Sequence, residues 1–317
     1  MLTMCLLGVV CAAAFAAAAP GLSGKLPPRT AIYLLVGGAA VTTGAVLGML
    51  ALLGLTLLAR VPLVASLGDW SLARLRTGAP APAWAAVSGL VLLVPAGAAG
   101  LAAGFRHTTA MLRLRRACRD LRSQDTLVVV DSDLPDAFAT PVDGGHVVVT
   151  TGMLRALHGD EVRALLEHER SHLRHRHAWW MLAAQLCGAV NPMLRGVVRA
   201  AGHAVERWAD EDAARTVGDR RLVARTLARA ALHVHDAVGA VPLNAPGTVG
   251  AMNGTVLVRV QSLLREPPRR HLVATVTLLA LALSTVTPAV AVRDRADDFF
   301  DGAHARPTVT RSVPEIR

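Results

Sequence analysis

The residues most able to do chemistry stand together in one short motif. His168-Glu169-Arg170-Ser171-His172 fits the pattern His-Glu-x-x-His, and good helix formers precede it. Because residues four apart lie on one face of a helix, both imidazoles can reach a single Zn²⁺. Glu169 lies beside them, where it can take a proton from a zinc-bound water. The motif predicts His168 and His172 as metal ligands and Glu169 as the catalytic base of a hydrolase, against the alternative of a chance match.

A catalytic zinc ion needs a third protein ligand and an open position. We assign Glu206 as that ligand for about one Zn²⁺ per chain, because its side chain is long and a helix is predicted around it. Asp210 falls one turn later on the same face, where it can orient a zinc-bound imidazole. The alternative is a solvated acidic face that pairs with Arg207 and Arg215. No Cys-x-x-Cys pair offers a thiolate site instead.

Other polar residues near the motif are expected to have different roles. His175 and His177 follow His172 too closely to share its helix face, so we expect a polar, solvated or membrane-facing edge. Glu211 and Asp212 rotate away from Asp210 by roughly 100° and 200°. The sequence does not identify the group that stabilises the oxyanion. The candidates, each also expected as a surface or structural residue, are His203, His233, His235 and an Arg.

Long apolar stretches argue against an ordinary soluble protein. Hydrophobic residues make up 53% of the 317 residues. Residues 1–19, 31–59, 83–105 and 272–292 contain no Asp, Glu, Lys or Arg. Each reaches or approaches the ~20 residues that a helix needs to cross a ~30 Å hydrocarbon core. We predict four transmembrane helices in a lipid bilayer. The first is kept as a membrane helix because it lacks the basic n-region of a secretory signal.

The distribution of positive charge predicts the orientation in the cell membrane. The formal net charge is +10, and Lys25 is the only Lys. Arg residues cluster after the third apolar stretch and before the fourth, which is typical of cytoplasmic flanks. We therefore expect a multi-pass membrane protein with residues 106–271 in the cytoplasm and both termini outside. No recognition module accompanies the charge, so direct nucleic-acid binding is not expected.

The segment between the third and fourth apolar stretches has the pattern of a small α+β domain. Residues 127–131 and 146–150 read as strands. Residues 137–140 lie between Pro135 and Pro141, which favours an edge strand. A helix is expected from about Asp160, its N-cap, through His172, and another at residues 193–217 after a break at Asn191-Pro192. The predicted fold class is a mainly α membrane protein with four transmembrane helices and a cytoplasmic α+β, zincin-like domain at 106–271. A short tail at 293–317 is expected outside.

The two motifs together resemble a known family. Glu206-Arg207-Trp208-Ala209-Asp210 after His-Glu-x-x-His is similar to the Glu-x-x-Ala-Asp signature of the membrane gluzincin peptidases, which include HtpX. The Asn191-Pro192 break, and three apolar stretches before the domain with one after it, most resemble the BlaR/MecR antirepressor type. That type ends in an extracellular penicillin-binding sensor, whereas about 25 residues follow the last apolar stretch here.

The resemblance implies a zinc endopeptidase whose site lies between two helices, beside a small sheet. It implies that the sheet edge holds the substrate, and a peptide can add as a strand along Ala137, Phe138 and Ala139. The leading hypothesis is cleavage of a cytoplasmic protein, with a winged-helix transcriptional repressor as the candidate partner. The alternatives are an HtpX-like quality-control protease and a non-catalytic membrane receptor that retains the zinc fold. The intact His168, Glu169, His172 and Glu206 weigh against the receptor.

The Arg clusters generate a prediction about topology. A reporter fused after Arg122 should report the cytoplasm, and one fused after Asp301 should report the outside. Paired reporters that are active on opposite sides of the membrane measure both positions. An outside location for the Arg122 fusion would contradict the cytoplasmic placement of the site.

Overall fold

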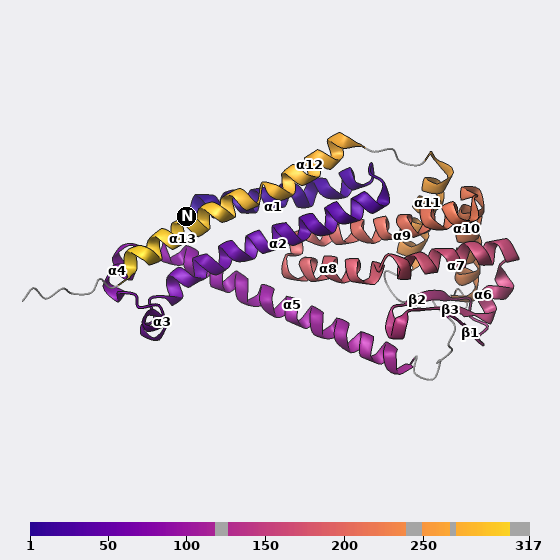
Figure 1. Ribbon diagram of the computed structural model, residues 1–317, viewed down its shortest axis with the longest axis horizontal. Coiled ribbons are helices and arrows are strands. Elements are labelled where there is room, and N and C mark those ends of the chain that lie inside the picture. The colour runs from indigo at the N-terminus through magenta and orange to yellow at the C-terminus, as the bar shows by residue number, and fades with distance from the viewer. Residues whose placement is uncertain (118–125, 239–248, 267–270, 305–317) are drawn as a thin grey trace, which may run out of the picture. The chain divides into compact units, whose positions relative to one another are not determined.

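Long helices dominate the computed structural model, which describes residues 1–117, 126–238, 249–266 and 271–304 (Figure 1). Four helical segments are long and apolar enough to cross a membrane: Leu2–Ser23, Pro28–Leu58, Ala83–Arg116 and Leu272–Ala303. They correspond to α1 (Leu2–Ser23), α2 (Pro28–Leu58), α5 (Ala83–Ala117), and α12 (Leu272–Leu283) with α13 (Val286–Ala303). The predicted fold class is confirmed in its architecture: the described part of the chain is mostly helical, has four candidate membrane helices and contains a small sheet in the domain between the third and fourth.

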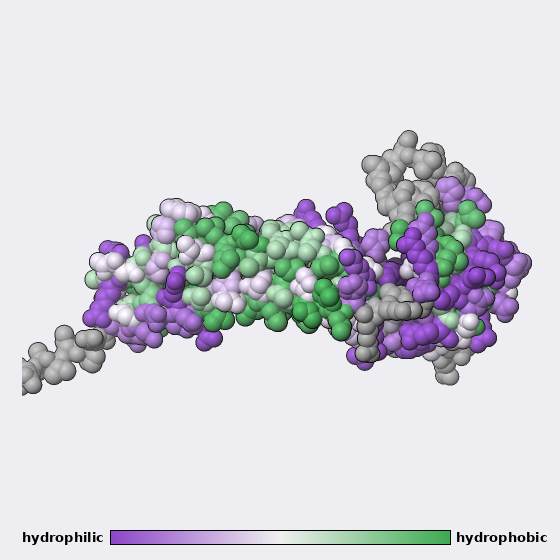
Figure 2. Space-filling view, turned by 90° about the horizontal axis from the view of Figure 1, so that it is seen from above, coloured by the Kyte–Doolittle hydropathy of each residue, from purple (hydrophilic) through white to green (hydrophobic). Residues whose placement is uncertain are grey.

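The long helices carry apolar side chains on their outer faces. Figure 2 shows hydrophobic residues over much of their visible surface. Large apolar side chains that are at least half exposed occur on α1, α5 and α12, among them Leu6, Val10, Val91, Leu101 and Leu272. In water such exposure would oppose folding, whereas lipid chains are as apolar as these side chains. This surface is what membrane-spanning helices require.

One compact unit comprises Met1–Ala12, Val41–Gly97 and Ala282–Arg317. It includes the short helices α3 (Pro62–Leu67) and α4 (Leu72–Thr77). A Cβ atom on Gly89 would lie 3.0 Å from the Leu50 carbonyl oxygen, so glycine permits the close approach of α5 to α2.

Trp70 stacks on Phe300 with 4.6 Å between ring centroids. This contact explains why α13 continues to Ala303, although a polar tail was expected from residue 293. Residues 305–317 of that tail lie outside the described residues.

The second unit, Ala13–Ala40 with Ala98–Leu281, contains a three-stranded sheet. Its strands are β1 (Leu127–Val130), β2 (Ala137–Thr140) and β3 (His146–Thr150), in the order β1-β3-β2. The central β3 pairs parallel to β1 and antiparallel to β2. All three predicted strands are present, and β2 is an edge strand as the flanking prolines indicated. The Arg cluster after the third apolar stretch lies on α5 as far as Ala117, and residues 118–125 lie outside the described residues.

The edge strand leaves part of its backbone unpaired within the sheet. Thr150 donates its backbone N–H to the Asp136 carbonyl at 3.0 Å, so Asp136 occupies a hydrogen-bonded position of the ladder. Antiparallel pairs alternate between hydrogen-bonded and non-hydrogen-bonded positions. Ala137 and Ala139 therefore direct their backbone N–H and C=O groups away from β3. These groups line the free edge of the sheet.

Among the described residues, six further helices belong to the second unit, which also includes parts of α1, α2, α5 and α12. They are α6 (Thr151–Ala156), α7 (Gly159–Arg174), α8 (His177–Val190), α9 (Arg195–Val217), α10 (Arg220–Val238) and α11 (Val249–Leu264). α7 packs against α9, α10 and the sheet. The predicted break before α9 is a short 3-10 turn, Pro192–Leu194, in which the Asn191 side chain accepts the Met193 N–H at 3.2 Å. The helices α6, α10 and α11 were not predicted.

The start of α7 differs from the prediction by two residues. Asp160 was expected as the N-cap, but the cap is His158 and Asp160 lies in the first turn. The Glu161 carboxylate accepts the His158 backbone N–H at 3.0 Å and is paired with Arg229 at 2.8 Å. A carboxylate in the first turn is also favoured by the helix dipole. This contact with α10 is not visible from local sequence preference.

Gly152 is predicted to be essential for the junction between the sheet and α6. A Cβ atom there would lie 2.3 Å from the Asp133 carbonyl oxygen, which is fixed backbone. Gly152→Ala should destabilise the protein by about 1–3 kcal/mol through overpacking. Thermal unfolding in detergent would measure it. Gly159→Ala is the matched control, because a Cβ atom there meets nothing within 4 Å. Equal melting temperatures for the two variants would contradict the prediction.

Candidate active site

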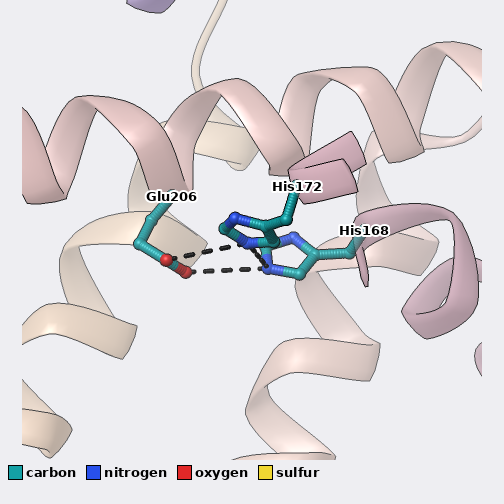
Figure 3. A group of neighbouring side chains, drawn as sticks. All are labelled: His168, His172 and Glu206. Carbon is teal, nitrogen blue, oxygen red and sulfur yellow. Dashed lines mark hydrogen bonds and ion pairs between the residues drawn. The ribbon is translucent and has the colours of Figure 1, made fainter. Parts of the chain in front are cut away.

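The structure brings the two motif histidines and the downstream glutamate into one cluster. His168 and His172 lie on α7 and Glu206 on α9, with one possible donor atom of each within 4.8 Å of the others (Figure 3). The Glu206 carboxylate oxygens are 3.6 Å from His168 Nε2 and 3.7 Å from His172 Nε2. The two Nε2 atoms are 3.3 Å apart. Two imidazoles and a carboxylate on two packed helices fit a catalytic zinc ion.

The other ring nitrogen of each histidine also has a polar neighbour. His168 Nδ1 lies 3.0 Å from Asp210 Oδ1, and Asp210 is only 1% exposed. His172 Nδ1 lies 3.1 Å from His177 Nδ1. Such neighbours fix the orientation and tautomer of a metal-binding imidazole, which leaves Nε2 free to face the ion. Asp210 therefore lies where the sequence placed it, beside His168.

The expectation that His177 forms a solvated or membrane-facing edge is wrong. The prediction assumed one continuous helix, but α7 ends at Arg174. Arg176 has φ 52° and ψ 43°, in the left-handed region, and α8 begins at His177. This turn brings His177 back against His172 and leaves it 1% exposed. Burial lowers the pKa of His177 to about 3, so its neutral ring can accept a hydrogen bond from His172.

Arg259 on α11 is a site residue that the sequence analysis missed. Its Nε and Nη2 donate to the two oxygens of Asp210 at 2.8 and 2.6 Å. Its Nη1 lies 2.9 Å from Glu206 Oε2, and Nη2 lies 3.4 Å from His168 Nε2. The planar guanidinium group has two parallel N–H donors, which match the two oxygens of one carboxylate. No local motif marks Arg259, because it reaches the site only through the packing of α11.

Electrostatics in the cluster favour positive charge at its centre. Burial lowers the pKa of His168, but contacts with Asp210 and Glu206 outweigh it and raise the pKa to about 10. Burial raises the pKa of Glu206, yet His168 and Arg259 hold it well below its usual range. Burial lowers the pKa of His172 to about 4, which keeps that imidazole neutral, as metal binding requires. An ionised carboxylate beside a neutral imidazole suits a divalent cation.

Glu169 lies between the histidine cluster and the edge strand. It is 9% exposed, and burial raises its pKa to about 7. The backbone of Ala139 hydrogen-bonds to it. A carboxyl group with a pKa near neutrality can both accept and return a proton. The free edge of β2, where Ala137, Phe138 and Ala139 lie, therefore reaches the predicted base.

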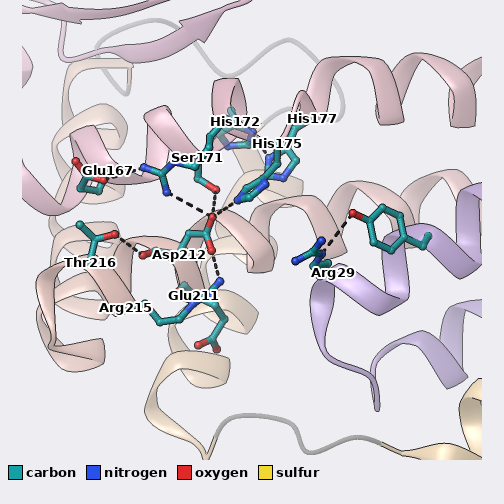
Figure 4. A network of polar contacts seen from close by, with 12 residues as sticks. Arg29, Glu167, Ser171, His172, His175, His177, Glu211, Asp212, Arg215 and Thr216 are labelled. Atoms are coloured by element: carbon teal, nitrogen blue, oxygen red, sulfur yellow. Dashed lines mark hydrogen bonds and ion pairs between the residues drawn. The ribbon is translucent and has the colours of Figure 1, made fainter.

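The remaining acidic residues of α9 have structural partners. Asp212 is 6% exposed and accepts a hydrogen bond from Ser171 Oγ at 2.8 Å (Figure 4). It also contacts His175 Nε2 at 2.5 Å and pairs with Arg215. The His175 ring stacks on Trp208, so it too packs inside rather than forming a solvated edge. Asp212 thus joins α9 to α7.

Glu211 and the three other candidate histidines lie away from the cluster. Glu211 pairs with Arg220 at 3.0 Å. His203, His233 and His235 are exposed. In the described part of the chain, Arg259 is the Arg that contacts the cluster.

Comparisons with known proteins agree with this geometry. Residues 109–247 match the model of Peptidase family M48. The chain is 48% identical over 62 residues to a Protease HtpX homolog of Aeropyrum pernix, and 43% identical over 60 residues to one of Thermoplasma acidophilum. These alignments cover 19% and 18% of this chain. A Protease HtpX homolog of Thermodesulfovibrio yellowstonii is 26% identical over 197 residues, which is 48% of this chain and 68% of that relative.

The matches cover only part of this chain and of its relatives. The chain spans 19% of the length of each of the first two relatives. No solved structure matches. The matched family segment contains His168, Glu169, His172, Glu206 and Asp210, and ends before Arg259. Together the matches and the metal-binding cluster show that this part of the chain is similar to the M48 and HtpX peptidases.

The cluster generates a prediction about metal affinity. Glu206→Gln should remove most zinc binding, because a ligand is lost, while Asp210→Asn and His177→Ala should each weaken it about 10- to 100-fold. Glu211→Gln is the matched control on the same helix, and it should bind zinc like the wild type. Competitive titration of the metal-free protein with a zinc chelator measures these affinities. Wild-type affinity in Glu206→Gln would contradict the assignment.

Proposed function

We propose that this protein is a membrane-embedded, zinc-dependent endopeptidase of the HtpX type that cleaves protein chains in the cytoplasm. The convergence of His168, His172 and Glu206 beside a buried Glu169 carries the proposal. His168, His172 and Glu206 would hold the zinc ion. When bound, zinc supplies a Lewis acid that polarises the scissile carbonyl and makes a water molecule more acidic.

Glu169 is proposed as the general base and acid. Its buried carboxylate would take a proton from the attacking water and then deliver it to the leaving amine. The pKa near 7 suits both halves of this transfer. The contact with the Ala139 backbone would hold the carboxylate at the edge of the sheet, where the scissile bond must lie. Because Glu169 directly follows His168 in the motif, the proton would move over only a short distance.

Arg259 is proposed to hold the two carboxylates of α9 in place. It forms a two-pronged pair with Asp210 and reaches Glu206 at 2.9 Å. Two ionised carboxylates one helical turn apart repel each other unless a cation lies between them. Arg259 would therefore fix Asp210 against His168 and Glu206 toward the metal. As the cation nearest the cluster, it is also the best candidate to stabilise an oxyanion.

The substrate is proposed to bind as an extra strand along β2. The outward N–H and C=O groups of Ala137 and the outward C=O group of Ala139 can pair with an extended peptide. Phe138 is 39% exposed and supplies an apolar contact on the strand. Such pairing would place the peptide beside Glu169. This arrangement agrees with cleavage inside a chain, because a strand can continue past both ends of β2.

Cleavage of a winged-helix transcriptional repressor in a signalling pathway is the second candidate function. The resemblance to the BlaR/MecR type favours it, through three apolar helices before the domain and one after it. The HtpX-type role accounts for the same helices and also for the sequence matches. We therefore prefer turnover of membrane or cytoplasmic proteins to a dedicated repressor.

Replacement of the base tests the proposed chemistry. Glu169→Gln should keep the fold and the bound zinc but reduce cleavage of an unfolded protein such as casein by at least about 100-fold, because an amide cannot accept the proton. Zinc content and turnover are measured on the same preparation. Wild-type turnover in this variant would show that another base acts or that a contaminating protease is present.

A further inference from the structure

A basic and aromatic pocket lies at the junction of α7, α8, α9 and α2, outside the metal cluster. Its volume is about 430 Å³. It is lined by three of the five Trp residues and by the only Tyr, together with two Arg. These residues are Trp179, Trp180, Trp208, Tyr33, Arg174 and Arg176, and His175 completes the lining. The catalytic steps proposed above use none of them.

The aromatic side chains form a packed wall rather than a loose group. Tyr33 meets Trp180 and Trp208 edge to face, with ring centroids 5.1 and 6.0 Å apart. The Arg29 guanidinium lies 5.8 Å from the ring centroids of both Tyr33 and Trp208. Its Nε also donates to the Tyr33 hydroxyl at 3.4 Å. These cation–π contacts hold the positive charge of Arg29 against the aromatic side chains.

The pocket has positive charge that nearby acids do not neutralise. Arg176 is exposed and has no ion pair within the described residues. Arg174 shares Glu167, at 3.3 Å, with Arg170, and lies 3.9 Å from Asp212. Asp212 is already paired with Arg215. The left-handed turn at Arg176 fixes this arginine at the rim, so the chain presents an unpaired guanidinium there.

The position of the pocket along α2 matches the headgroup layer of a bilayer. α2 has 31 residues and is therefore about 46 Å long, which exceeds the ~30 Å hydrocarbon core by ~8 Å at each end. Tyr33 lies five residues after Pro28, or about 7.5 Å along the helix. A spanning α2 thus places Tyr33 at the boundary between acyl chains and headgroups. Trp and Tyr are enriched at this depth.

We propose that this pocket binds the phosphate headgroup of an anionic phospholipid. Arg174 and Arg176 would contact the phosphate, and the Trp rings would pack against the glycerol and the first acyl carbons. Basic pockets beside membrane helices bind anionic headgroups in this way. Trp179 is 64% exposed, so an apolar surface continues from the pocket toward the lipid chains. That surface favours a lipid over a free phosphate.

Lipid retention by the full-length protein tests this proposal. The protein in neutral detergent is mixed with phosphatidylglycerol or with phosphatidylcholine, and bound lipid is measured by native mass spectrometry. We expect one phosphatidylglycerol per chain to be retained in preference to phosphatidylcholine. Arg176→Gln should weaken this binding about fivefold, as expected for one interfacial charge. Because Arg176 has no ion-pair partner in the described residues, this variant should fold normally.

Arg163→Gln is the matched control, since Arg163 is an exposed residue of α7 that does not line the pocket. It should retain phosphatidylglycerol like the wild type. Glycerol 1-phosphate, which has the phosphate without acyl chains, should bind far more weakly than the lipid. Equal retention of the two lipids, or an unchanged affinity in Arg176→Gln, would overturn the proposal. Equally tight binding of glycerol 1-phosphate would identify a soluble anion site instead.

Discussion

The burial of opposite charges between α7, α9 and α11 is the constraint on which the site depends. Asp210 is 1% exposed, and an unpaired carboxylate there would be strongly unfavourable. Arg259 contributes two hydrogen bonds to it, and His168 lies against its other side. Removal of one partner from such a buried pair typically costs about 3–5 kcal/mol. The pairing therefore fixes three helices and, with them, the direction in which His168 faces.

The site was predictable from sequence where its geometry is local. His168, Glu169 and His172 lie within one helical turn, and Glu206 and Asp210 lie one turn apart on another helix. The helix repeat alone thus determines which side chains share a face. The edge position of β2 was predictable for a similar reason, because Pro135 and Pro141 bracket a short extended segment.

The rest of the site depends on contacts that no local pattern records. His177 reaches His172 because Arg176 adopts a left-handed conformation, which is uncommon for a residue other than glycine. A continuous helix would have directed His177 elsewhere, which is why the sequence analysis assigned it to an outer edge. Arg259 enters from α11, a helix without a motif. Its role follows only from the packing of α11 against α9 and α10.

The free edge of β2 has a consequence for selectivity. Recognition through backbone N–H and C=O groups reads the conformation of a peptide more than the identity of its side chains. The outward-facing residues Ala137 and Ala139 have small side chains that form no deep specificity pocket. Under the proposed binding of substrate along β2, a protein chain would qualify by being locally unfolded and extended, with little dependence on its sequence. Such an edge is suited to surveillance of damaged chains, since native proteins rarely expose an unpaired extended segment.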